Sequence, residues 1–397
     1  MLVADTEKRA RAIRFIVCLG IVSMFADITY EGARSVIGPF LNTLGASATE
    51  VGLIAGIGEM LAASLRFFSG RLADRTRSYW TITIVGYGVN LIAVPALAFA
   101  GHWWMAAILV ALERTGKSIR GPARDVLLSE ATAVVGHGWG FGLHAALDQT
   151  GAVIGPLIVA ATVLKSHAFG PAFLGLVFPA AAAVAALLVA RAWFPAQGAT
   201  APQQIEQTHF PRIFWIYVAA SGLLACGFAD FALLSYHFQK TGIFQGPAMI
   251  PVLYSGAMAV NAFTAPLFGR LFDRFGIVML SVGTLISMLS LPLGFLGGPA
   301  AAMAGVACWA TGIGAQDAIL RSGIAQVVSM DKRGSAFGAF NGVFGIAWFL
   351  GSTTMGLLYD HSILALVVFG MLMQLGAAGF FLWLRRPLAV AAAAAAS

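Results

Sequence analysis

The sequence predicts an all-α integral membrane protein with twelve transmembrane helices in two six-helix pseudo-repeats. Of its 397 residues, 59% are hydrophobic and only 10% are charged. A soluble domain carries about 25% charged residues, so this chain cannot cover a surface that faces water. Apolar runs of about 20 residues, the length that crosses a bilayer, recur along the chain. In addition, one short charged segment occurs twice, once in each half of the sequence.

Each apolar run that lies between two polar or glycine-containing segments predicts one helix. The first 14 residues are polar and basic, and the run that follows is too long and too charged for a cleavable signal peptide, so it is expected to stay as the first helix. The twelve expected helices cover residues 14–41, 49–70, 79–100, 103–124, 139–164, 170–193, 212–239, 246–268, 277–296, 299–322, 335–359 and 362–384.

The distribution of basic residues predicts the topology. With an inside N-terminus, all but four of the 24 Lys and Arg fall in cytoplasmic loops or at helix ends beside them, including Lys117, Arg120 and Arg124 at the end of helix 103–124. The exceptions are Lys165, Lys240, Arg34 and Arg66. Because cytoplasmic loops of membrane proteins are enriched in Lys and Arg, we expect a multi-pass protein of the inner or plasma membrane with both termini in the cytoplasm. The net charge of +7 thus reflects topology and indicates no nucleic-acid partner.

Two sequence halves flank one polar segment. Residues 195–211 are rich in Pro, Gln and Gly and are expected to form a flexible cytoplasmic linker. The predicted domains are therefore a six-helix bundle in 1–194 and a second in 212–397. The halves also share short motifs: Phe25-Ala26-Asp27 with Phe228-Ala229-Asp230, Phe141-Gly142 with Phe337-Gly338, and Gly155 with Gly351.

The repeated charged segment runs from Gly70 to Arg77 and again from Gly269 to Gly276, and each copy is interpreted as a tight loop between two helices. Its pattern resembles the loop signature of the major facilitator superfamily, except that Arg77 stands where a Gly is usual. The resemblance implies the facilitator fold, with a substrate site between two halves that open to each side in turn. It implies gate roles for Gly70, Asp74, Arg75, Gly269, Asp273 and Arg274.

A second resemblance lies in helix 139–164. Gly151 and Gly155 are four residues apart, which lets another helix approach closely, and Pro156 weakens the backbone ladder. This segment is similar to a signature of facilitator antiporters, although the glycines that follow there are replaced by Leu157, Ile158 and Val159. Gly151, Gly155 and Pro156 are therefore expected to take part in the conformational change.

Ionisable residues inside the predicted helices are the candidate site. Such residues are costly in a bilayer and usually face an aqueous cavity or each other. The candidates for proton coupling or the substrate cavity are Asp27, Tyr30, Glu31, Arg34, Glu59, Glu113, Arg114, His144, Asp148, Gln149, Asp230 and Asp317. Structural alternatives stay open: Arg66 or Arg114 neutralises an acid, Asp230 is solvated near the outer end of its helix, and Asp317 pairs with Arg321 along one helix.

His144 and Asp148 lie one helical turn apart, and His144 is the only histidine expected well inside the membrane. An imidazole and a carboxyl on one face can share or pass a proton near neutral pH. We therefore expect Asp148 to carry the coupled proton and His144 to assist it.

The sequence thus predicts a secondary transporter, most simply a proton-coupled antiporter that exports a small organic molecule. The alternative is a symporter or uniporter for a nutrient, organic anion, metal ion or metal chelate. No triad, nucleotide loop or metal-ligand spacing supports an enzyme, whereas a non-transporting receptor on the same fold stays open. The three cysteines are far apart in apolar runs. We expect no cofactor and no resident metal, and a proton gradient is the expected driving force. The protein is expected to be a monomer whose partners are the lipid bilayer and a small-molecule substrate.

Overall fold

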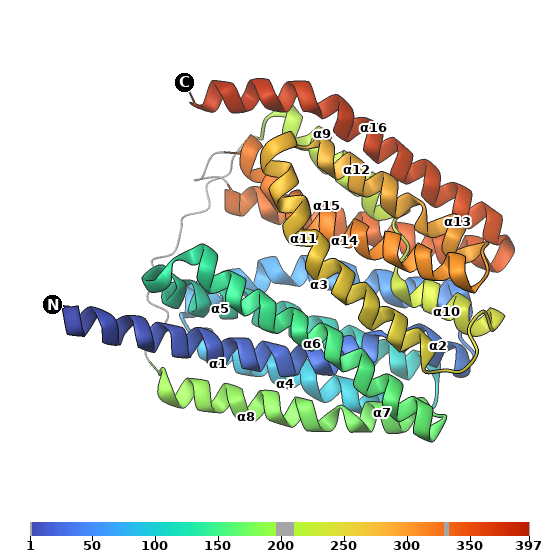
Figure 1. Ribbon diagram of the computed structural model, residues 1–397, viewed down its shortest axis with the longest axis horizontal. Helices are drawn as coiled ribbons and strands as arrows, with labels where there is room; N and C mark the ends of the chain where they lie inside the picture. Colours follow the sequence, from blue (N-terminus) through green and yellow to red (C-terminus); the bar gives the residue numbers. More distant parts are fainter. Residues whose placement is uncertain (1, 196–209, 329–332, 397) are drawn as a thin grey trace. The chain divides into compact units, whose positions relative to one another are not determined.

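The computed structural model describes residues 2–195, 210–328 and 333–396, and these residues form helices joined by short connections, with no strand among them (Figure 1). The all-α prediction is confirmed. Most of the predicted linker, 195–211, lies outside the described residues. The N-terminal helix begins earlier than expected, since α1 covers Leu2–Arg34.

Each predicted helical range is helical in the structure, although several ranges are divided between two shorter helices. In chain order they are α1 (Leu2–Arg34), α2 (Ile37–Thr43), α3 (Ala48–Thr76), α4 (Tyr79–Ala96), the 3-10 turn η1 (Leu97–Phe99), α5 (Trp103–Val135), α6 (His137–Ser166), α7 (Phe169–Gly175), α8 (Val177–Trp193), α9 (Arg212–Gly227), α10 (Phe231–Thr241), α11 (Met249–Phe275), α12 (Val278–Met288), α13 (Ser290–Phe295), α14 (Pro299–Val327), α15 (Arg333–His361) and α16 (Ile363–Ala396).

Ten segments within the described residues are long and apolar enough to cross a membrane. The other two expected spans lie in α5 and α14, which are helical over 33 and 29 residues but are too polar for the same criterion. In α5 the reason is a run of charged residues between Glu113 and Asp125. The multi-pass membrane class is therefore supported, and the count of twelve spans stays a prediction.

The described residues pack into two compact units that we treat separately. Unit 1 comprises Met1–Phe40, Leu65–Pro202 and Gly246–Ser255, and unit 2 comprises Leu41–Ser64, Gln203–Gln245 and Gly256–Ser397. Each unit thus includes a short segment from the other sequence half: the start of α11 packs within unit 1, and the start of α3 packs within unit 2. The proposed boundaries of the duplicated sequence, 1–194 and 212–397, stay predictions.

In unit 1, α1 packs along α6, α8 and α5, while α4 packs along α5 (Figure 1). The predicted glycine pair explains the closest of these contacts. A Cβ built on Gly151 would meet the Met24 carbonyl oxygen, and one on Gly155 would meet the Ile28 carbonyl oxygen. The backbones of α1 and α6 therefore touch at two successive turns, which only residues without a side chain permit.

In unit 2, α9 packs along α15 and α16, and α12 packs along α14 and α16. A Cβ on Gly351 of α15 would meet the Cys226 carbonyl oxygen of α9, so this unit has its own close glycine contact. Tyr217, which is fully buried, donates its hydroxyl to the Leu320 carbonyl oxygen at 2.8 Å and joins the apolar core around α9.

The expected helix 212–239 is interrupted in the middle. Residues Phe228 and Ala229 lie between α9 and α10, and Asp230 is the N-cap of α10, where its side chain accepts a hydrogen bond from the Ala232 amide at 2.9 Å. The Trp309 indole donates to the Ala229 carbonyl at 2.9 Å, so a backbone group freed by the break is satisfied. In contrast, the matching Phe25-Ala26-Asp27 motif is helical inside α1, and the two motifs therefore play different structural roles.

The repeated charged segments are helical, which corrects their interpretation as loops. Gly70 to Arg75 form the last turns of α3, and Gly269 to Arg274 form the last turns of α11. Each helix is followed directly by a residue with left-handed backbone, Arg77 at φ 52° and Gly276 at φ 67°. The chain turns there because the Arg77 and Gly276 amides bond to carbonyls four residues earlier, at 2.8 and 2.7 Å.

This shared geometry explains why the facilitator pattern has a Gly where this chain has Arg77. A side chain in the left-handed region costs about 1 kcal/mol more than glycine. We expect Arg77→Gly to raise the melting temperature of the purified protein by about 2 °C, and Gly276→Arg to lower it similarly. Differential scanning fluorimetry in detergent checks both. Opposite signs for the two variants are required, since a common sign would mean that the left-handed backbone at these two positions does not determine the change in stability.

Candidate functional site

Unit 1 holds a cluster of charged side chains among α1, α5 and α6. Its members are Asp27, Tyr30, Glu31 and Arg34 on α1, Glu113, Arg114, Lys117, Arg120, Arg124 and Asp125 on α5, and His144 and Asp148 on α6. Helix α1 presents its acids at a spacing of four residues, which keeps them on one face. The basic residues of α5 recur every three or four residues and form a matching stripe.

Glu31 is the most heavily engaged acid of the cluster. It is 7% exposed, and its Oε1 lies 4.0 Å from the Arg34 guanidinium and 3.8 Å from the Lys117 ammonium. The Tyr254 hydroxyl, from the start of α11 within unit 1, donates to its Oε2 at 2.5 Å. Two cations and one short hydrogen bond therefore compensate the negative charge of the Glu31 carboxylate.

Glu113 has a structural environment. Its carboxylate lies 3.4 Å from Arg114 Nε and accepts a hydrogen bond from Asn90 Nδ2 of α4 at 2.9 Å. The same Asn90 nitrogen also donates to the Glu113 backbone carbonyl at 3.1 Å. These bonds join α4 to α5, which supports the structural alternative for Glu113 and Arg114.

Arg120 is a cation buried between aromatic rings. Its side chain is only 2% exposed, and its guanidinium carbon lies 4.2 Å from the centre of the Tyr87 ring and 5.7 Å from that of Tyr30. Stacking on ring faces stabilises a guanidinium that has left water. Lys117 and Arg120, which were counted among the basic residues at the cytoplasmic end of helix 103–124, thus lie within the charged cluster of unit 1.

Ser23 connects four helices of unit 1. Its hydroxyl lies 3.2 Å from the Tyr87 hydroxyl, 3.1 Å from His144 Nε2 and 3.2 Å from Arg124 Nη1, which donates to it. Arg124 in turn donates to its neighbour Asp125 at 2.9 Å. His144 is therefore held by a buried network, and the charge of Asp148 acts on it.

Asp27 and Asp148 differ from the other acids of the cluster. Each has a buried Oδ1 without a hydrogen-bond partner in the described parts of the chain. Asp27 is 5% exposed, Asp148 is half-buried, and they are close enough for their negative charges to act on one another. The close contact at Gly151 brings them together, because the Cβ position of Gly151 lies 3.0 Å from Asp27 Cβ and Asp148 is one turn earlier on α6.

The remaining candidates do not join this cluster. Glu59, Asp230 and Asp317 belong to unit 2, where Asp230 caps α10 and Asp317 accepts from Asn261 Nδ2 at 3.4 Å. Gln149 is half-buried next to Asp148. At the end of α3, Asp74 is exposed and accepts a hydrogen bond from the Tyr79 hydroxyl at 3.3 Å.

Sequence reasoning missed several polar partners. Ser23 lies one turn before Asp27 on the same face of α1, so its spacing from Asp27 could have indicated it. Nothing in the sequence indicates Tyr87 or Tyr254, because their partners are distant in sequence. His237 is a second buried histidine, 2% exposed, with Nδ1 2.9 Å from the Tyr359 hydroxyl in unit 2. It was overlooked because it lies near the end of its predicted helix.

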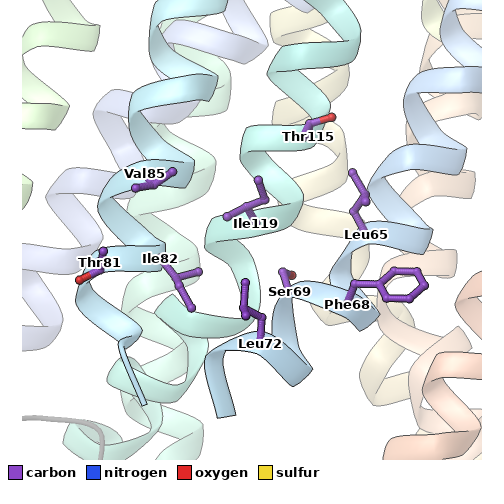
Figure 2. A pocket seen from close by; sticks show the side chains of 9 residues that line it. All are labelled: Leu65, Phe68, Ser69, Leu72, Thr81, Ile82, Val85, Thr115 and Ile119. Carbon is purple, nitrogen blue, oxygen red and sulfur yellow. The ribbon is translucent and has the colours of Figure 1, made fainter. Parts of the chain in front are cut away.

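A separate depression lies between α3, α4 and α5 of unit 1, and Figure 2 shows the side chains that line it. It measures about 360 Å³ and is lined by Leu65, Phe68, Ser69, Leu72, Thr81, Ile82, Val85, Thr115 and Ile119. Phe68 is 62% exposed, and the Ser69 hydroxyl already donates to the Ser118 carbonyl at 2.9 Å. Such an apolar lining suits hydrocarbon, so we place no polar substrate there.

Long apolar helices around a buried charged cluster are typical of a membrane transport protein. Residues 19–352 match the sequence profile of the Major Facilitator Superfamily, and the chain belongs to that family. An uncharacterized protein of Mycobacterium tuberculosis (strain H37Rv) is 39% identical over 394 residues, which cover 97% of this chain and 96% of that protein. An uncharacterized MFS-type transporter of Methanocaldococcus jannaschii is 27% identical over 113 residues, 28% of each chain.

Solved structures share the fold. The nucleoside transporter NupG matches with a TM-score of 0.69 at 16% identity, over 95% of this chain and 98% of that one. A POT family transporter in complex with 5-aminolevulinic acid matches with a TM-score of 0.72 at 14% identity, over 94% and 95% of the two chains. The protein is therefore a secondary transporter by family and fold, and its substrate has to be argued from its own residues.

Proposed function

We propose that the protein is a proton-coupled antiporter that exports a small organic molecule, and that Asp27 and Asp148 hold the coupled proton. One observation carries this proposal: two neighbouring acids each have a buried oxygen without a hydrogen-bond donor among the described residues. Repulsion between two such carboxylates is relieved when they share one proton. The other acids of the cluster each lie within 4.0 Å of a cation, and Glu113 also accepts a hydrogen bond from the Asn90 amide.

The proposed cycle follows from alternating access. When the site opens to the side of higher proton concentration, water enters and a proton binds to the pair. When it opens to the other side, the proton leaves and the freed carboxylates bind substrate. Since the proton and the substrate bind to the same acids, each must leave before the other binds. The cycle therefore exchanges protons for substrate across the membrane, which is antiport.

The glycine contact supports antiport as the mode of coupling. Gly151, Gly155 and Pro156 resemble the antiporter segment, and they lie in α6 where it touches α1 beside Asp27. Pro156 lacks the amide that would bond to the Ala152 carbonyl, and the next carbonyl, that of Val153, accepts from the Ser255 hydroxyl at 2.8 Å. A bend in α6 at this point would move Asp148 relative to Asp27.

The environment of the transporter is also a proposal. We propose the inner or plasma membrane, both termini in the cytoplasm and a monomer as the working unit. The positive-inside distribution supports the orientation, although Lys117 and Arg120 no longer count toward it because they are in the buried cluster.

A substrate screen in proteoliposomes tests the proposed function. Radiolabelled organic cations, anions and neutral compounds are offered with an imposed pH gradient, with and without an ionophore that collapses it. Antiport predicts accumulation of a substrate against its gradient on the side with more protons. Accumulation on the opposite side would indicate symport, and transport that ignores the gradient would refute proton coupling.

The gate assignment gives a further prediction. Asp74→Asn is expected to lower the maximal rate several-fold with little change in apparent affinity, because Asp74 lies outside the buried cluster and acts on the conformational step. Asp273→Asn should have a milder effect. Initial rates over a range of substrate concentrations measure both. Tyr79→Phe removes only the hydrogen bond to Asp74 and serves as the control; unchanged rates in both aspartate variants would eliminate the assignment.

A further inference from the structure

Lys117 has a position in the cluster that its place in the sequence did not suggest. Its ammonium nitrogen lies 3.8 Å from the centre of the Tyr30 ring and 3.8 Å from Glu31 Oε1. The side chain is 23% exposed, so it lies at the rim of the cluster. The charged groups that act on it are Asp27 and Glu31 from α1 and Glu113 and Arg114 from its own helix.

The ammonium is held without a tight ion pair. A charge-assisted hydrogen bond between an amine and a carboxylate is typically about 2.8 Å long, and the distance to Glu31 is 3.8 Å. The ring face and the surrounding carboxylates therefore hold the cation together. An aromatic face beside carboxylates is the arrangement with which proteins recognise organic ammonium groups.

Asp27 completes this site. Its buried Oδ1 has no hydrogen-bond donor among the described residues, although the charge of Lys117 acts on it. The site therefore offers one oxygen that Lys117 does not bind. The four-carbon stem of a lysine is flexible, so the ammonium can leave without rearrangement of the helix that carries it.

We infer that Tyr30, Glu31 and Asp27 form a binding site for an organic ammonium group, and that Lys117 occupies it in the absence of substrate. The substrate class is then a small organic amine that is protonated at neutral pH. Its ammonium group displaces that of Lys117, so the charge within the site stays the same during the exchange. This inference rests on the proposed exchange at the acids of unit 1.

Removing the resident cation tests the site without knowledge of the substrate. Lys117→Met keeps the apolar stem and leaves the acids without this cation, so the melting temperature should fall. Ethylammonium chloride should restore it saturably, with half-saturation on the order of 1–10 mM. Sodium chloride at equal ionic strength and ethanol at equal concentration should not. If Lys117→Met does not fold, Lys117→Gln is purified in the presence of ethylammonium, and its melting temperature is measured with and without ethylammonium in the same way.

Two matched variants make the test specific. Lys240→Met removes an exposed lysine that lies 5.3 Å from the Tyr236 ring and 5.4 Å from the Tyr359 ring, and ethylammonium should have no saturable effect on it. Adding Tyr30→Leu to Lys117→Met should weaken ethylammonium binding at least several-fold. A response to ethylammonium no larger than to sodium chloride, or one equal in the Lys240→Met protein, would overturn the inference.

The outcome is separable from that of the proposed function. Thermal stabilisation by ethylammonium requires no proton gradient and no transport. If ethylammonium restores the melting temperature of Lys117→Met while transport does not depend on the proton gradient, the ammonium site is supported and proton coupling is refuted. Absence of rescue combined with gradient-driven transport of a non-amine would refute only the ammonium site.

Discussion

Replacing Asp148 by Asn is expected to lower accumulation driven by a pH gradient at least about ten-fold while exchange down a substrate gradient continues. Asparagine has the size of aspartate but cannot carry the proton. The structure favours this residue because its Oδ1 has no donor among the described residues and its charge acts on Asp27 across the contact of α1 with α6. Uptake into proteoliposomes with and without the gradient measures the effect.

Two further variants separate proton carriage from structural support. Asp27→Asn should produce a similar loss, because the proposal places one shared proton on the pair, whereas His144→Gln should shift the pH profile without abolishing coupling. If Asp148 were only a structural counter-charge, Asn would leave a cation such as Arg124 less compensated and the protein would unfold at lower temperature. A stable Asp148→Asn protein with wild-type accumulation would show that the proton binds elsewhere, and Asp27, Glu31 and Glu59 would be tested next.

The helical membrane fold could be predicted because the bilayer limits the possible structures. Apolar runs of this length must form helices in lipid, so composition alone predicted the class. The interruptions could not be predicted in this way. At the break before Asp230, the Ala229 carbonyl is bound by Trp309, which is about eighty residues away in the sequence. The helical end of α3 could not be predicted because Gly70 and the charged residues after it suggested a turn, whereas the helix continues to Thr76 and the left-handed residue is Arg77.

The acids of the site could be predicted because charge inside an apolar run is rare and costly. What sequence could not predict was the compensation of each acid. Glu113 is bound by Asn90 and Glu31 by Tyr254, and these partners come from other helices. Lys117 was assigned to the cytoplasmic side because basic residues near helix ends usually lie there. Only the packing of α5 against α1 reveals its position over the Tyr30 ring.

The close contact between α1 and α6 leads to the second large effect. The Cβ position of Gly155 falls on the Ile28 carbonyl oxygen, so any side chain there must separate the two helices that carry Asp27 and Asp148. Overpacking of a tight core usually costs about 1–3 kcal/mol. We expect Gly155→Ala to lower the melting temperature by several degrees and to reduce transport strongly, and Gly155→Leu to prevent purification of folded protein.

Gly142 provides the matched control on the same helix, because its Cβ position has no neighbour within 4 Å. Gly142→Ala should be neutral or slightly stabilising, as alanine favours a helix over glycine by about 1 kcal/mol. In unit 2, Gly351 faces the Cys226 carbonyl oxygen while Gly342 is open, so Gly351→Ala and Gly342→Ala should repeat the contrast. Thermal unfolding and uptake measured on the four alanine variants decide the matter. Equal stability of the Gly155→Ala and Gly142→Ala proteins would mean that the two helices tolerate separation, and the close contact would then not explain how Asp27 and Asp148 are held together.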